Sequence, residues 1–156
     1  MALQSLFKIQ TWQLPIHMNT TQNLHPLNLE TAEKSIRLLA TAFFHQDLKT
    51  LDAHFGISPL QMDEAFEALE NYLGKDDFTS LAPPPIGSHI VLEEDEICAD
   101  DENSSIRVYR LNYGGWGYEM DVFMQDKRCD LTMRGELPGD FSKNPHGIKF
   151  HLFEVM

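Results

Sequence analysis

The spacing of apolar residues changes part-way along the chain, and that change restricts the fold more than any other feature of the sequence. Between residues 28 and 74 apolar side chains recur every three or four positions, as on one face of a helix. From Trp116 to Met133 they alternate, as in a strand with one buried face. Helices followed by strands are typical of α+β folds. We therefore expect N-terminal helices packed on one face of a C-terminal antiparallel sheet of about four strands.

Local start and stop signals divide the front half into three expected helices, over residues 28–44, 47–56 and 58–74. Each begins at a side chain that can accept a hydrogen bond from a first-turn backbone N–H: Asn28, Asp47 and Ser58. The third helix has the strongest signal. A first-turn proline and a capping-box glutamine follow its cap, and a glycine follows its last turn.

A hairpin is expected around a turn at residues 125–128. Its register pairs apolar residues on the inner face: Met124 with Cys129, Val122 with Leu131, and Met120 with Met133. The same register places Glu119 opposite Arg134 on the outer face, where opposite charges attract. An earlier strand over residues 106–113 and a last strand over residues 148–155 complete the expected sheet.

Acidic residues outnumber basic ones by 24 to 12, which gives the chain a net charge of −12. Such a chain lacks the lysines and arginines that displace counterions from a phosphate backbone, so nucleic acid is excluded as a partner. The charge favours a basic protein partner instead. No run of about 18 apolar residues is present, so we expect no membrane span and no membrane partner.

Residues 1–27 are expected to form an arm or a strand, and residues 28–156 a single α+β domain. The first residues do not read as a secretion signal, because Lys8 and other polar residues interrupt them and no small-residue cleavage site follows. Two cysteines, Cys98 and Cys129, are too few for a disulfide scaffold. These features predict a cytoplasmic protein with reduced thiols.

The densest charge lies in residues 93–102, where seven of ten residues are acidic and none is basic. The segment is interpreted either as a solvated loop or as a surface that attracts a cationic partner. Its acids lack the spacing of a calcium loop. If it binds a partner, the contacts are expected from its acids and from an exposed aromatic ring beside the Gly-Gly turn: Glu93, Glu94, Asp95, Glu96, Asp100, Asp101, Glu102 and Tyr113.

No motif for catalysis, metal binding or cofactor binding accompanies these features. The seven histidines are scattered, without Cys-x-x-Cys or His-x-x-x-His spacing, and no phosphate loop, nucleophile elbow or dinucleotide fingerprint is present. A helix-turn-helix starting near Leu51 is rejected, because its second helix carries acids where DNA phosphates would lie. We therefore expect no catalytic residue, no metal and no cofactor.

The segment from Gly115 to Phe123, together with Cys129-Asp130-Leu131-Thr132-Met133, resembles a family of small bacterial domains of unknown function. Those domains have a similar aromatic-rich hairpin, an Asp-Leu-Thr strand and a last strand ending in an apolar pair, here Val155-Met156. The resemblance covers residues 30–156 and implies a fold without catalytic residues. As a class, the chain is also similar to the immunity proteins that bind bacterial toxins.

The leading hypothesis is a non-catalytic protein-binding domain, specifically an immunity protein that neutralises a cognate toxin by blocking a basic surface. A small-molecule-binding or hydrolytic domain of cone-shaped α+β type is the first alternative. It requires a deep pocket with converging polar groups, such as His89 or Asp121. A homodimeric adaptor subunit is the second alternative, and it requires an exposed apolar patch.

Overall fold

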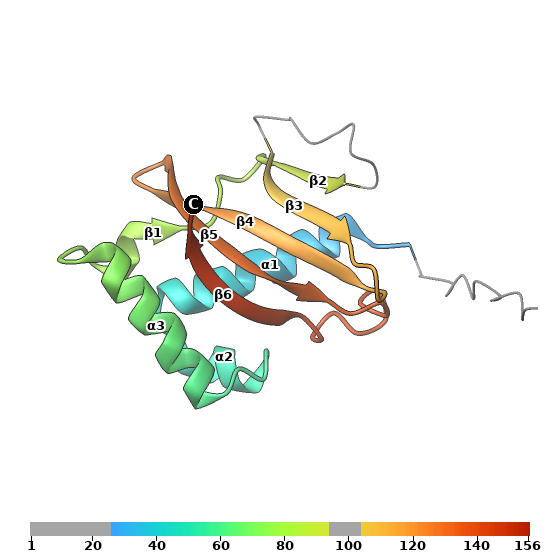
Figure 1. Ribbon diagram of the computed structural model, residues 1–156, viewed down its shortest axis with the longest axis horizontal. Coiled ribbons are helices and arrows are strands. Elements are labelled where there is room, and N and C mark those ends of the chain that lie inside the picture. The colour runs from blue at the N-terminus through green and yellow to red at the C-terminus, as the bar shows by residue number, and fades with distance from the viewer. Residues whose placement is uncertain (1–25, 94–103) are drawn as a thin grey trace, which may run out of the picture.

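The computed structural model describes residues 26–93 and 104–156, which form three α-helices and one sheet (Figure 1). The helices come first: α1 (Leu29–Phe44), α2 (Leu48–Ala53) and α3 (Pro59–Leu73), followed by the short 3₁₀ helix η1 (Phe78–Ser80). The strands follow: β1 (Leu81–Ala82), β2 (His89–Glu93), β3 (Ser104–Arg110), β4 (Trp116–Met124), β5 (Lys127–Leu137) and β6 (Lys149–Val155). The α+β class predicted from the sequence is confirmed.

The helices begin at the three predicted cap residues. The side-chain carboxamide of Asn28 and the carboxylate of Asp47 each accept a hydrogen bond from the backbone N–H three residues later, both at 3.1 Å. Ser58 and Gln61 form a capping box, in which each side chain accepts from the backbone N–H of the other residue. These contacts satisfy first-turn donors that have no partner within a helix, so they fix where each helix starts.

The sheet differs from the prediction in strand number and direction. Its strands lie in the order β2-β3-β4-β5-β6, and β1 pairs with the end of β4. The strands from β3 to β6 are antiparallel neighbours, as expected, but β2 is parallel to β3. The antiparallel sheet of about four strands is therefore a mixed sheet with two additional strands. A five-residue strand such as β2 is too short for its alternation to stand out in the sequence.

The hairpin between β4 and β5 is tighter than predicted. Its turn consists of Gln125 and Asp126, whose φ angles of 50° and 61° are those of a two-residue type I′ turn. Met124 consequently pairs with Lys127, and the predicted pairing of Met124 with Cys129 is wrong. A bulge in β5 restores the register, so that Met120 does face Met133 and Glu119 does face Arg134.

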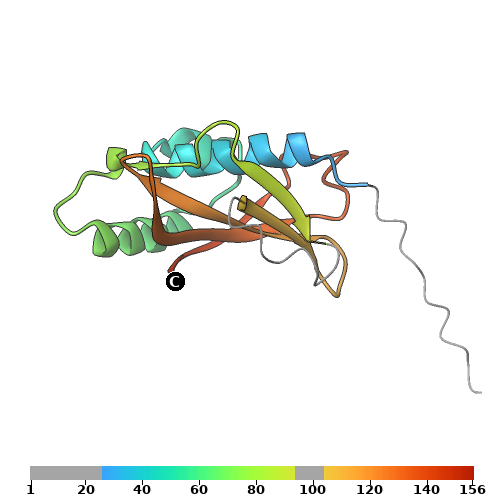
Figure 2. The same ribbon diagram turned by 90° about the horizontal axis from the view of Figure 1, so that it is seen from above.

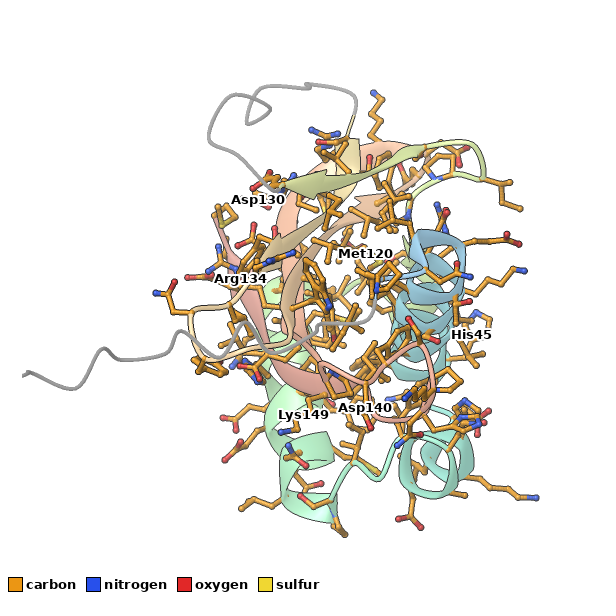
Figure 3. The ribbon with its side chains drawn as sticks, turned by 90° about the vertical axis from the view of Figure 1, so that its right-hand side faces the viewer. His45, Met120, Asp130, Arg134, Asp140 and Lys149 are labelled. Atoms are coloured by element: carbon orange, nitrogen blue, oxygen red, sulfur yellow. The ribbon has the colours of Figure 1, made fainter. Side chains whose placement is uncertain are left out.

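The hydrophobic core lies between α1 and one face of the sheet (Figure 2). Phe43 of α1 is fully buried, with its ring 4.5 Å from that of Phe150 and 5.3 Å from that of Phe153. Met120 points from β4 into the same layer, as Figure 3 shows. The third helix packs against β6 at the edge of the sheet. Across residues 26–93 and 104–156, no helix has both the length and the apolar character needed to cross a membrane.

Candidate functional site

The open face of the sheet carries six charged side chains in a row, which we call the charge ladder: Arg107, Arg128, Arg134, Glu119, Asp121 and Glu154. Glu119 lies between two arginines, 3.4 Å from Arg107 and 3.2 Å from Arg134. Arg134 continues the ladder to Glu154 at 3.0 Å, on the side of the sheet away from α1 (Figure 3). Equal numbers of acids and bases make the ladder neutral.

Asp121 forms the least exposed part of this ladder. The residue is 6% exposed, and its carboxylate lies 2.9 Å from Arg107 and 3.2 Å from Arg128. The hydrolytic alternative placed Asp121 in a pocket beneath the helices, but the residue lies on the open face and is already held by two guanidinium groups. The space beneath α1 holds the fully buried side chains of Tyr118 and Met120 instead. The position of the His89 side chain lies outside what the structure describes.

The negative charge of the chain is concentrated in one part of the described fold. Residues 104–156 contain seven acids and seven bases, so the sheet from β3 onward is balanced. Residues 47–77 contain eight acids and only two bases. We call this segment, which comprises α2, α3 and the adjoining turns, the acidic helix pair. Its net charge of −6 is half of the total for the chain.

A groove with a volume of about 680 Å³ opens in the acidic helix pair. Four apolar and three polar residues line it: Leu48, Pro59, Met62, Phe66, Gln46, Asp52 and Asp63. Leu48 is 54% exposed, although it is a large apolar side chain. Figures 1 and 3 place the two helices near one another at one end of the molecule. The groove therefore combines accessible apolar surface with carboxylates.

The two carboxylates of the groove are available to a ligand. Neither Asp52 nor Asp63 takes part in an ion pair or side-chain hydrogen bond with another residue of the described segments. Nearby, the hydroxyl and backbone N–H of Thr50 donate to Asp47 and lower the pKa of its carboxyl group. Asp47 thus remains ionised at neutral pH and adds to the negative potential around the groove.

The structure describes only two of the residues predicted to bind a partner. Glu93 is the last residue of β2 and is partly exposed. Tyr113 is 71% exposed, and its hydroxyl donates to Glu136 at 2.5 Å. It lies in the turn after β3, which ends at Arg110, so the predicted strand over residues 106–113 extends too far at this end. The remaining predicted residues, Glu94, Asp95, Glu96, Asp100, Asp101 and Glu102, lie outside the described residues. The groove was not predicted, and its only signal in the sequence is the row of acids on the third helix.

The described cysteine lies in the sheet, and two of the described histidines form a pair. Cys129 is partly buried, and its thiol donates to the carbonyl oxygen of Val122 at 3.1 Å in the bulge of β5. His54 and His146 lie within hydrogen-bond distance, with 3.2 Å between ring nitrogens, although 92 positions separate them in the sequence. No group of three or more potential metal ligands occurs among the described residues.

Tyr72 connects the acidic helix pair to the sheet. Its hydroxyl donates to the carboxylate of Asp130 in β5 at 2.6 Å. Burial and this hydrogen bond together raise the pKa of the Tyr72 hydroxyl well above its usual range. The contact fixes the C-terminal half of α3, while the groove lies at its N-terminal half.

Comparison of the chain with protein families, with curated proteins and with solved structures finds no match. The resemblance to small bacterial domains and to immunity proteins therefore stays a prediction, and the function has to be inferred from the geometry and charge of the described residues.

Proposed function

We propose that this chain is a non-catalytic domain that binds a basic protein partner through the acidic helix pair. One observation carries the proposal: eight acids and two bases lie in residues 47–77, whereas acids and bases are equal in number in residues 104–156. Six of the charged side chains in residues 104–156 pair with one another in the charge ladder. The helix pair presents an unbalanced charge to the solvent.

Such a charge acts mainly on the rate of association. At physiological ionic strength an exposed charge is felt over about 8 Å, so acids grouped on one surface act together on an approaching partner. Complementary surfaces raise association rates above those of neutral proteins and orient the encounter. The exposed acids of α3 occupy successive turns of the helix: Asp63, Glu64, Glu67 and Glu70.

An immunity protein that blocks the basic surface of a bacterial toxin in the cytoplasm is the kind of binder we propose. A toxin that acts on nucleic acid needs a basic surface, since its substrate carries condensed counterions that must be displaced. An acidic protein that covers such a surface inhibits by exclusion, and it needs no catalytic group of its own. The acidic segment 93–102 would add to the attraction in the same way.

Affinity purification of the tagged chain from its source cells tests this proposal when it is combined with charge variants. We expect a basic protein to be retained at about 0.05 M salt and released at about 0.5 M salt, because screening weakens long-range attraction. Neutralising two acids of α3 with Glu67→Gln and Glu70→Gln is expected to slow association of the purified partner severalfold. Asp126→Asn with Asp140→Asn is the matched control, because both acids are exposed and lie on loops of the balanced sheet.

The proposal fails if the retained protein is not basic. It also fails if the association rate is the same at both salt concentrations and in both pairs of variants.

A further inference from the structure

We propose that the groove between α2 and α3 docks a helical segment of the partner, with an apolar side chain between the two helices and a lysine or arginine beside Asp52 and Asp63. This inference rests on the proposed function and names the ligand class and its site. Three properties of the groove lead to this ligand: its apolar lining, its unpaired acids and its helical backbone.

The apolar lining of the groove favours a partner with an apolar side chain at this position. Leu48, Pro59, Met62 and Phe66 come from both sides of the groove, and Leu48 is 54% exposed. Burying a large apolar side chain stabilises a complex by about 1.5–3 kcal/mol. An apolar side chain that enters the groove would cover this surface together with its own, and would therefore provide most of the affinity at this site.

The unpaired acids favour a basic side chain of the partner next to that apolar one. Asp52 projects from α2 and Asp63 from α3, so the groove has a carboxylate on each side. The third polar lining residue, Gln46, is neutral. A negatively charged or strictly apolar ligand would leave two carboxylates partly desolvated without a partner, whereas a lysine or arginine would pair with them.

The helical backbone of the groove favours a helical ligand over an extended peptide. An extended peptide binds well where a strand edge offers free N–H and C=O groups. Here the lining comes from helices, whose interior backbone groups bond to each other, and side chains of Asp47 and Ser58 already accept from first-turn N–H groups. A helical ligand satisfies its own backbone and presents apolar and basic side chains on neighbouring turns.

The test uses an amphipathic leucine–lysine peptide of about 18 residues and the full-length chain labelled with ¹⁵N. Chemical-shift changes are expected in residues 46–66, around the groove, rather than over all acidic surfaces. Leu48→Gln is expected to weaken peptide binding about tenfold, because it removes an apolar contact. Asp52→Asn with Asp63→Asn is expected to weaken it about fivefold.

Each variant has a matched control. Leu60→Gln changes a leucine of α3 that is 68% exposed and does not line the groove. Asp76→Asn with Asp77→Asn removes the same charge from the turn after α3, beyond the far end of that helix from the groove. All four variants change exposed positions alone, so unchanged thermal melting confirms that each variant folds.

The outcomes separate this inference from the proposed function. The groove is not the site if the peptide shifts the resonances of all acidic surfaces equally and the control pair Asp76→Asn with Asp77→Asn weakens peptide binding as much as the groove pair does. A basic partner can still bind in that case. If a leucine–glutamate peptide binds equally well, or the leucine–lysine peptide does not bind, the inference is also overturned. If the partner binds equally well at both salt concentrations in the purification experiment, the proposed function itself is overturned.

Discussion

The phenol of Tyr118 allows a quantitative prediction, because the side chain is fully buried and has a defined partner. Its hydroxyl donates to the backbone carbonyl of Lys149 at 3.0 Å. Tyr118→Phe keeps the ring and removes the hydroxyl, which leaves that carbonyl without this donor. A hydrogen bond of this kind contributes about 1 kcal/mol, so the variant is expected to be less stable by about that amount at pH 7.

The same substitution should have the opposite effect at high pH. Burial raises the pKa of Tyr118 far above its ordinary value of 10.0, so the phenol stays neutral in the folded chain but ionises in the unfolded one. Its contribution to stability is therefore complete below pH 10 and is lost as the pH rises further. At pH 11 the ionisation of the unfolded chain lowers wild-type stability by about 1.4 kcal/mol. Phenylalanine has no such loss, so the two stability curves should cross at about pH 10.6.

Urea denaturation of both proteins between pH 7 and pH 11 measures this crossing. Tyr113→Phe is the control, because Tyr113 is 71% exposed. Removing this hydroxyl should not reverse which of the two proteins, variant or wild type, is the more stable between pH 7 and pH 11. If Tyr118→Phe stays less stable than the wild type by the same amount at pH 11, the phenol ionises equally in both states, and the reasoning from burial is refuted.

Three further substitutions test the fold and the site. Gly135→Ala should lower stability by more than about 2 kcal/mol in thermal melts, because the added Cβ would lie 2.0 Å from the backbone oxygen of Lys149. Asp121→Asn should cost about 2 kcal/mol in urea denaturation, because it removes the carboxylate that Arg107 and Arg128 share, while the exposed Asp126→Asn should stay within about 0.5 kcal/mol. Ser58→Ala should cost about 1 kcal/mol and speed amide hydrogen exchange in the first turn of α3, where the groove is formed; unchanged exchange there would contradict the role of the capping box.

The helices could be predicted from the sequence because their ends depend on local contacts. The Ser58 capping box requires only residues three positions apart, so its pattern is visible without knowledge of the fold. The pairing of Glu119 with Arg134 was also visible, since alternation on both strands restricts the register. The turn was predicted too long because Gln125-Asp126 lacks the glycine that usually marks a type I′ turn.

The candidate site was less accessible to sequence reasoning because it depends on how elements meet. Leu48 falls on the apolar stripe of its short helix, which predicts burial, yet it is 54% exposed. Asp52 and Asp63 are eleven positions apart in the sequence, and only the approach of α2 to α3 makes them line one groove. The parallel pairing of β2 with β3 is likewise not visible in a local pattern, because it joins residues far apart in the sequence, such as Ile90 and Ile106.

The acidic helix pair also implies a cost in stability, which gives a last prediction. Residues 47–77 contain eight acids and two bases, and the acids repel one another. In the charge ladder of the sheet, by contrast, acids and bases are equal in number and attract one another. Raising the salt concentration from about 0.05 M to about 0.5 M should therefore slow amide exchange in α3, because screening relieves the repulsion, and should leave β4 and β5 unchanged or slightly less protected. Faster exchange in α3 at high salt would show that the acids do not repel strongly enough to matter. If the expected pattern is found, a basic partner that neutralises the helix pair must also stabilise it, because any ligand that binds the folded state alone raises its stability.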